Sequence, residues 1–180
     1  MLRPGRCKNA AGLRRFAHGT DVAEAETVII YTDGGCLGNP GPGGYGVVMK
    51  YGPHRKEMSG GFRLTTNNRM ELMGAIVALE ELKTPCKVWL HTDSAYVVNA
   101  MEKGWARKWQ RNGWRKPDKQ PAMNPDLWER LLGQCAVHDV KFVWVRGHNG
   151  DVENERCDAL ANQAQAQPKQ SLPPDTGYAG

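Results

Sequence analysis

The sequence predicts an α/β domain in which helices flank one mixed β-sheet. Two observations support this fold class: five short apolar or alternating segments are typical of strands, and segments with helical periodicity separate the later ones. At 180 residues, with 40% hydrophobic and 24% charged residues, the chain matches one soluble globular domain with a substantial core. Because no stretch reaches the length of a membrane span, we expect no membrane partner.

The first three strands are expected in the N-terminal half of the domain. Residues 28–33 begin with an apolar run, which predicts a buried strand. Residues 34–44 are rich in glycine and proline, which predicts a tight loop. Residues 45–50 alternate as a half-buried strand does, and residues 54–63 should return beside them as an antiparallel strand after a glycine–proline turn.

Helices alternate with strands in the rest of the domain. Leu72, Ile76 and Leu79 recur at helical spacing and predict a helix over residues 68–82. Asn124, Pro125 and Asp126 are typical of a helix start, with a cap and a proline in the first turn. The other expected elements are a strand at 88–90, a short helix at 94–101, a helix at 127–136, a strand at 140–145 and a helix at 151–165.

Both ends of the chain are expected to be flexible. Residues 1–26 begin with a stretch rich in arginine and free of acids, which predicts a basic extension. The alternative, a mitochondrial transit peptide, is less favoured because serine is absent there. Residues 166–180 contain several prolines and glycines and should form a flexible tail. The domain therefore spans residues 27–165.

Four acidic residues in separate motifs form a candidate site. Asp33 and Asp93 each follow a predicted strand, whereas Glu71 and Asp158 lie on predicted helices that could cover the same sheet edge. Carboxylates that lie close together repel each other unless protons or cations neutralise them. Hard cations such as Mg²⁺ bind through a few carboxylates and often take a substrate phosphate as a further ligand. The set therefore predicts two-metal phosphodiester hydrolysis.

Each acid taken alone also has a structural interpretation. Asp33 could form a turn, and Asp93 could cap the helix that follows it. Asn68 and Glu71 have the spacing of a capping box, which would explain Glu71 without a ligand role. Asp158 could be an ordinary solvated helix residue. Only the combination of the four favours a metal site.

His148 and the cysteines bear on the chemistry and on the compartment. His148 lies between glycines in a predicted loop, where its imidazole could move protons near neutral pH or stand idle in solvent. The five cysteines are odd in number and show neither a C-x-x-C pair nor a zinc spacing. We therefore expect no disulfide framework and a reducing, cytoplasmic compartment.

Tryptophans and basic residues alternate over residues 103–119. Basic side chains contact phosphates and exposed rings stack on sugars or bases, so the segment predicts a nucleic-acid-binding surface. The alternative is that the tryptophans anchor the segment to the core and the charges form a solvated face. The tryptophans are Trp105, Trp109 and Trp114, and the cations are Lys103, Arg107, Lys108, Arg111, Arg115, Lys116 and Lys119.

Taken together, seven motifs closely resemble bacterial type 1 ribonuclease H. In chain order over residues 27–165 they are TDGGCLGNPGPGGYG, TTNNRMELMGAIVALE, TDSAYV, KGWARKWQRNGWRK, NPDLWERL, VRGHNG and ENERCDALA. The resemblance implies a ribonuclease H-like fold with a five-stranded mixed sheet in the order 3-2-1-4-5, whose first three strands are antiparallel. It also implies an endonuclease that cleaves the RNA strand of RNA–DNA hybrids to 3′-hydroxyl and 5′-phosphate ends. We expect a monomer without an obligate protein partner.

The resemblance also implies roles for individual residues. The ligands of Mg²⁺, or of Mn²⁺ as a substitute, would be Asp33, Glu71, Asp93 and Asp158, and His148 would assist proton transfer or product release. Asn39, Asn67, Asn68 and the backbone near Cys36 match positions that read the minor groove of the RNA strand, and Thr66 matches a phosphate-binding position. The segment with Trp105, Lys108, Trp109, Arg111, Trp114, Arg115 and Lys116 resembles a basic protrusion that grips the DNA strand.

One departure and two alternatives follow. Ala95 stands where close relatives carry a glutamine that contacts RNA, so we expect one minor-groove contact to be lost. A non-catalytic hybrid-binding module is disfavoured by the intact acids, because clustered negative charge does not help a protein to bind phosphates. A junction resolvase or integrase of the same fold is disfavoured by the asparagines, whose amides can both donate to the RNA 2′-hydroxyl and accept from it.

Overall fold

A computed structural model of the chain describes residues 27–178, and the basic extension expected at residues 1–26 lies outside this part. Five strands form one sheet in the order β3-β2-β1-β4-β5. The first three strands are antiparallel neighbours, and the last two run parallel to β1. The predicted mixed sheet and its strand order are confirmed. The strands are β1 (Val28–Cys36), β2 (Gly41–Tyr51), β3 (His54–Thr65), β4 (Lys87–Thr92) and β5 (Asp139–Trp144).

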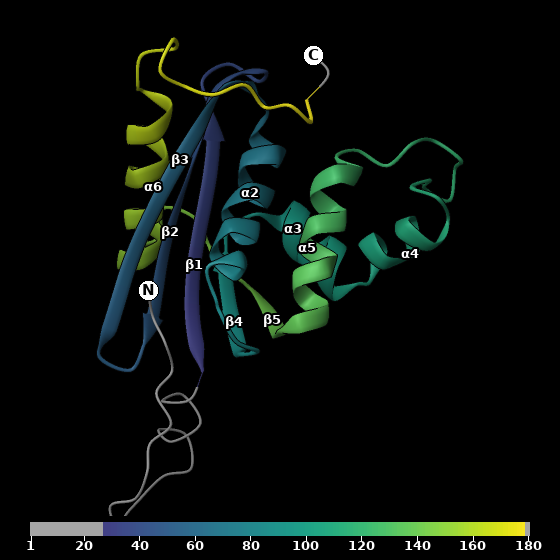
Figure 1. Ribbon diagram of the computed structural model, residues 1–180, viewed down its shortest axis with the longest axis horizontal. Coiled ribbons are helices and arrows are strands. Elements are labelled where there is room, and N and C mark those ends of the chain that lie inside the picture. Colours follow the sequence, from purple (N-terminus) through teal and green to yellow (C-terminus); the bar gives the residue numbers. More distant parts are fainter. Residues whose placement is uncertain (1–26, 179–180) are drawn as a thin grey trace, which may run out of the picture.

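Helices lie on both faces of this sheet (Figure 1). On one face α6 (Val152–Gln165) packs across β1 and β2, and on the other face lie α2 (Asn67–Glu80), α3 (Ala95–Glu102) and α5 (Pro125–Val137). The short helix α4 (Trp105–Arg111) lies beyond α5, on the side of the molecule away from the sheet. None of the helices within residues 27–178 is long and apolar enough to cross a lipid bilayer.

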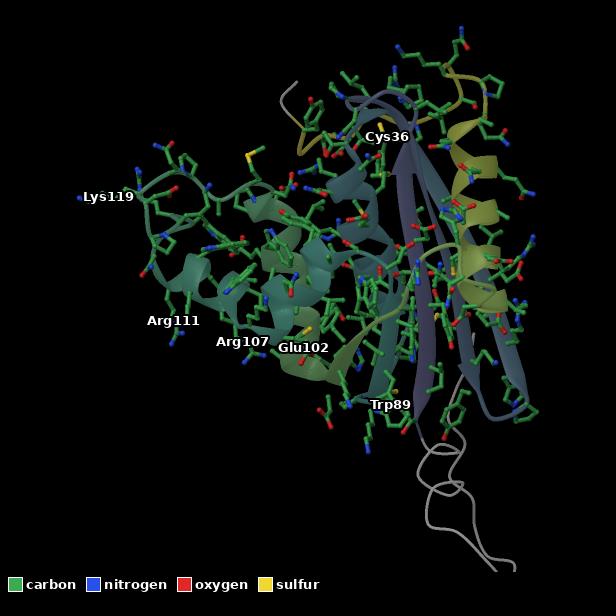
Figure 2. The ribbon with its side chains drawn as sticks, turned by 180° about the vertical axis from the view of Figure 1, so that it is seen from behind. Cys36, Trp89, Glu102, Arg107, Arg111 and Lys119 are labelled. Carbon is green, nitrogen blue, oxygen red and sulfur yellow. The ribbon has the colours of Figure 1, made fainter. Side chains whose placement is uncertain are left out.

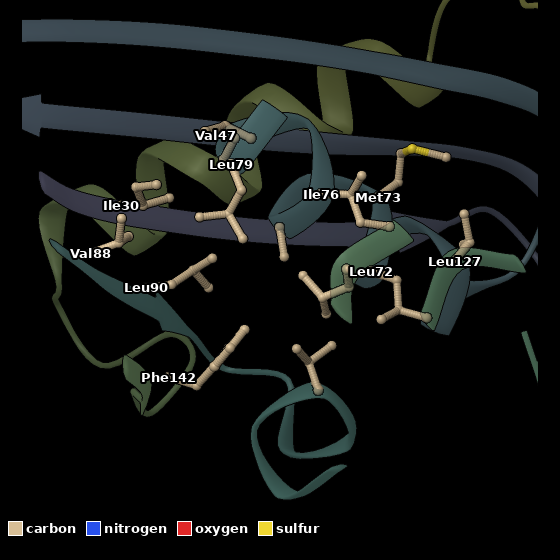
Figure 3. Close-up of a cluster of buried hydrophobic side chains, with 14 of the residues drawn as sticks. Ile30, Val47, Leu72, Met73, Ile76, Leu79, Val88, Leu90, Leu127 and Phe142 are labelled. Atoms are coloured by element: carbon tan, nitrogen blue, oxygen red, sulfur yellow. The ribbon is translucent and has the colours of Figure 1, made fainter. Parts of the chain in front are cut away.

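The main core fills the space between the sheet and the helices α2 and α5 (Figure 3). Ile30 and Leu90 point into it from adjacent parallel strands, and Leu72, Ile76 and Leu79 meet them from one face of α2. All five side chains are fully buried, and each burial stabilises the fold by about 1.5–3 kcal/mol. This rigid layer holds β1, β4 and α2, the three elements that carry or precede Asp33, Asp93 and Glu71.

The glycine-rich stretch after β1 differs from the prediction. We expected a loop over residues 34–44, whereas β1 continues to Cys36 and β2 begins at Gly41. Many of these glycines lie where helices contact the sheet backbone. A Cβ added to Gly34 would lie 2.4 Å from the Met70 carbonyl carbon, and one added to Gly44 would lie 2.4 Å from the Ala161 carbonyl oxygen. Glycine here allows close helix packing on a strand instead of forming a turn.

The C-terminal segment also differs from the expected flexible tail. It runs back from α6 toward the ends of α2 and α5 (Figure 1). Asp175 is buried there and accepts hydrogen bonds from Arg69 Nε at 2.6 Å and from Thr65 Oγ1 at 2.7 Å. Arg69 in turn pairs with Asp126 of α5 at 2.7 Å. Composition misled here because an ion pair with distant residues, which leaves no periodic pattern, orders the segment.

Candidate active site and nucleic-acid surface

The two acids expected at strand ends lie side by side, although Asp33 is within β1, which continues to Cys36, and only Asp93 follows its strand. β1 and β4 are parallel neighbours, and Thr32 of β1 is paired with Thr92 of β4. The residues that follow, Asp33 and Asp93, are therefore neighbours near the carboxyl end of β4. This is the position at which open α/β sheets place their sites, as the sequence predicted.

The other two acids come from helices on opposite faces of the sheet. Glu71 lies in the N-terminal half of α2, and Asp158 lies in the middle of α6. Their charges, together with that of Asp93, all raise the pKa of Asp33. The structure thus brings the four acids, from three elements and the segment after β4, into one electrostatic cluster.

Burial is the main influence on the two acids with shifted pKa values. The pKa of Asp33 is raised to about 7, mainly by burial and also by the charge on Asp93, while a hydrogen bond of 2.7 Å from the Gly34 N–H opposes the rise. Burial also raises the pKa of Glu71 to about 7, against a hydrogen bond that the Ser94 hydroxyl donates to it. Near neutral pH, both carboxyls therefore need a proton or a cation to balance their charge.

Neither Glu71 nor Asp93 acts as a helix cap. Thr66 caps α2, because its Oγ1 accepts from the Arg69 N–H at 3.4 Å. Ser94 caps α3, because its Oγ accepts from the Val97 N–H at 3.3 Å. The capping box expected from Asn68 and Glu71 is thus replaced by a different cap. Both acids are left available for another role.

The loop between β5 and α6 brings His148 to the same edge. His148 is exposed, with a left-handed backbone (φ 52°), and lies next to Gly147, which packs against the carboxylate of Asp93. A Cβ added to Gly147 would lie 2.4 Å from Asp93 Oδ2. His148 therefore lies on a loop that contacts the acid cluster. A residue that exchanges protons at the edge of this cluster would need such a position.

The predicted RNA-reading residues gather around the turn after β1 and the start of α2. Asn39 Oδ1 accepts from the Asn67 N–H at 3.1 Å, which ties the turn to the helix. The thiol of Cys36 donates to backbone carbonyls, including that of Thr65 at 3.3 Å. Asn39, Thr66 and Asn68 line a shallow pocket of about 510 Å³. Amides and a hydroxyl thus face solvent together on one surface.

The basic segment forms a ridge, defined here as residues 103–119. Figure 2 shows Arg107, Arg111 and Lys119 projecting outward from the part of the molecule farthest from the sheet. Trp105, Lys108, Arg111 and Lys116 line a pocket of about 520 Å³ on the ridge. This pocket offers cations for phosphates and an indole for stacking on one surface.

The tryptophans of the ridge divide between the two predicted roles. Trp109 and Trp114 are half-buried against the core, and the ring of Trp109 meets Trp128 edge-on at 5.9 Å. Trp105 is 40% exposed, with the Lys103 ammonium 5.0 Å from its ring centre. Two tryptophans therefore anchor the ridge, and one remains open to a ligand.

Comparison with known proteins gives the family. A model of the RNase H family matches residues 25–166 of this chain. The chain belongs to the ribonuclease H family. Ribonuclease H of Desulforamulus reducens is 66% identical over 145 residues, which cover 81% of this chain and 91% of the relative. Ribonuclease H of Syntrophus aciditrophicus is 62% identical over 151 residues, which cover 84% of this chain and 86% of the relative.

Solved ribonuclease H structures share the fold. LC9-RNase H1, described as a type 1 RNase H with the type 2 active-site motif, matches with a TM-score of 0.70 at 34% identity, over 78% of this chain and 72% of that one. LC11-RNase H1 in complex with an RNA/DNA hybrid matches with a TM-score of 0.60 at 28% identity, over 76% of this chain and 95% of that one.

Two features of this ribonuclease H site do not follow from the sequence patterns. Ser94 has the pattern of a helix start, but its hydroxyl also donates a hydrogen bond to the Glu71 carboxylate. Its place directly after Asp93 was the available signal. The second feature is the group of Arg69, Asp126 and Asp175 beside the asparagine pocket. No local pattern reveals it, because Arg69 and Asp175 are 106 positions apart.

The oxygen donors of the acid cluster suit a hard cation. Carboxylates of aspartate and glutamate are the ligands that Mg²⁺ and Mn²⁺ prefer, and a cation would offset the charge that burial penalises at Asp33 and Glu71. Across residues 27–178, no three acidic, histidine or cysteine side chains are close enough to hold one ion as they stand. The residues therefore fit the cation by chemistry and placement, although their side chains are not arranged as a closed shell.

Proposed function

We propose that this ribonuclease H is an endonuclease that hydrolyses the RNA strand of RNA–DNA hybrids, leaving 3′-hydroxyl and 5′-phosphate ends. The observation that carries the proposal is the cluster of Asp33, Glu71, Asp93 and Asp158, brought together from three elements and the segment after β4, in a protein that also carries the asparagine surface and the ridge. Relatives named ribonuclease H at more than 60% identity support it, as does the complex of LC11-RNase H1 with an RNA/DNA hybrid.

The four acids would hold two Mg²⁺ ions, for which Mn²⁺ could substitute. When bound, the cations supply water activation and stabilisation of the leaving oxygen. The protein's part is to present ionised carboxylates at fixed positions. Ser94 contributes a hydrogen bond from its hydroxyl group to Glu71, and this bond fixes the orientation of that carboxylate.

His148 would exchange protons at the rim of the site. His148 is exposed to solvent and follows Gly147, whose backbone contacts the Asp93 carboxylate. An imidazole can both accept and donate a proton, which suits transfer of a proton to the leaving group. This position outside the cluster makes His148 an assistant to hydrolysis and not a ligand.

Strand choice would come from two separate surfaces. The amides of Asn39 and Asn68 can both donate to a 2′-hydroxyl and accept from it, which distinguishes RNA from DNA. The ridge offers cations and the exposed Trp105 for the second strand. A substrate with RNA on one strand and DNA on the other satisfies both surfaces at once. Ala95, at the exposed start of α3, offers no polar group to either strand.

We also propose a monomer that acts in the cytoplasm. One chain carries the acid cluster, the asparagine surface and the ridge, so the reaction calls for no second subunit. The cysteines within residues 27–178 are free thiols, which suits a reducing compartment.

The test is cleavage of an RNA–DNA hybrid labelled separately on each strand, with Mg²⁺ and with chelator. Double-stranded RNA, double-stranded DNA and a four-way DNA junction serve as substrate controls. We expect cutting confined to the RNA of the hybrid and abolished by chelator and by Asp33→Asn. Tight hybrid binding without cutting would instead identify a non-catalytic binding module, and cutting of the junction alone would identify a resolvase.

A further inference from the structure

The end of β5 and the loop that carries His148 both contact Asp93. Trp144, the last residue of β5, donates its indole Nε1–H to the backbone carbonyl of Asp93 at 3.1 Å. Val145 follows and donates its N–H to the carbonyl of Thr92 at 3.0 Å. From the other side, the Cα of Gly147 faces the Asp93 side chain, so closely that an added Cβ would lie 2.4 Å from Oδ2 and 3.3 Å from Cγ. Both the backbone and the carboxylate of Asp93 are thus in contact with this loop.

The need for glycine at position 147 comes from this contact. In the same loop, Gly150 has a φ of 78°, a conformation that favours glycine whatever surrounds it. Gly147 is not among the residues with a positive φ, so its backbone would accept other residues. The obstacle to a side chain is the Asp93 carboxylate itself.

The hydrogen bond from Trp144 also has a specific consequence. Trp144 is 54% exposed, so burial does little to fix its ring. Its N–H instead bonds to the one residue of the acid cluster that lies outside every strand and helix. Without that bond, the position of the Asp93 backbone would be fixed only by the strand before it and by the Ser94 cap after it.

We propose that Gly147 and Trp144 are positioning residues for Asp93, which hold its carboxylate in the orientation that binds the cation. This inference rests on the proposed metal-dependent function and deepens it. The atom nearest to a new Cβ at position 147 is the end of a side chain and not backbone, so the protein can relieve the clash by rotating that carboxylate. Gly147→Ala should therefore disturb cation binding while it leaves the fold intact.

The experiment compares Gly147→Ala and Trp144→Phe with Gly133→Ala in the full-length chain. A Cβ at Gly133, on the exposed face of α5, has no heavy atom within 4 Å and is the matched control. Mg²⁺ affinity is measured by NMR titration without substrate, and unfolding by urea is measured in chelator. We expect Gly147→Ala to weaken Mg²⁺ binding about 10–100-fold, the loss typical when a group that orients a ligand is changed. Trp144→Phe should also weaken Mg²⁺ binding, and Gly133→Ala should have the Mg²⁺ affinity of the wild type.

Several outcomes would overturn the proposal. One is wild-type Mg²⁺ affinity in Gly147→Ala. Another is a slower turnover at unchanged affinity, which would mean that the loop acts through His148. If Gly147→Ala unfolds in chelator, Trp144→Phe decides, because Trp144 is 54% exposed and the smaller phenyl ring removes the N–H donor with little loss of burial. A wild-type protein that neither binds Mg²⁺ nor cuts hybrid would instead refute the proposed function.

Discussion

Replacing Asp33 with asparagine should stabilise the cation-free protein at alkaline pH while abolishing its activity. The pKa of Asp33 rises from 3.8 to about 7 on folding, chiefly because the carboxyl is buried. Between these two values, the folded protein keeps a proton that the unfolded chain has released. Stability therefore falls as pH rises through this window, and above about pH 7 the full cost of the ionised carboxylate remains.

The size of the effect follows from the shift in pKa. A shift of about 3 units corresponds to about 4 kcal/mol, and the cost grows from about 2 kcal/mol at pH 5 to about 4 kcal/mol at pH 8. Asparagine has nearly the same shape, and its Oδ1 can still accept the hydrogen bond from the Gly34 N–H. The substitution therefore removes the charge and leaves most of the packing.

The assay is urea unfolding in chelator at pH 5 and pH 8, with tryptophan fluorescence as the signal. Asp139→Asn, at an exposed position that starts β5, is the control for loss of a charge. Asp33→Asn should gain more stability at pH 8 than at pH 5, and added Mg²⁺ should narrow the gap by stabilising the wild type. If Asp33→Asn is no more stable than the wild type at pH 8, burial of the carboxylate does not carry this cost.

Three other predictions test other parts of the molecule. Asp175→Ala should cost about 3–5 kcal/mol in urea unfolding because it leaves Arg69 buried with one partner fewer, and a cost below 1 kcal/mol would deny the C-terminal segment this role. Arg111→Ala with Lys116→Ala should raise KM for hybrid and reduce the slope of log KM against log salt by up to about 2, whereas an unchanged slope would exclude these cations from phosphate contact. His148→Ala should slow turnover without abolishing it, and an inactive variant would give the imidazole an indispensable role.

The order of the elements and the identity of the acids could be predicted because both leave local patterns. Alternation marks the strands, and helical spacing of residues such as Leu72 and Ile76 marks α2. Asp33 and Asp93 could be paired because each acid directly follows the apolar part of its strand, although β1 itself continues past Asp33 to Cys36. A parallel pairing then brings the two ends together without further information.

The remaining features depend on contacts between distant segments. Glu71 has the spacing of a capping box, yet its carboxylate bonds to Ser94, which only the packed structure brings near. The glycines of residues 34–44 resemble a loop, yet Gly34 and Gly44 lie within β1 and β2 and are needed where α2 and α6 touch the strand backbone. In each case, tertiary packing overrides a local preference, as is expected near functional sites.

Buried charges in this protein are either paired with another side chain or left unpaired, and the unpaired charges of the site lower the stability of the fold. At the sheet edge, Asp33 and Glu71 are buried without a cationic side chain among the causes of their pKa shifts, so ionising them costs stability. A short distance along α2 from Glu71, the buried Arg69 pairs with the buried Asp175 and with the exposed Asp126. The protein thus satisfies one buried charge with its own side chains and leaves the other unsatisfied. An arginine placed among the acids would stabilise the fold by occupying the place of the cation, and it would thereby remove the activity.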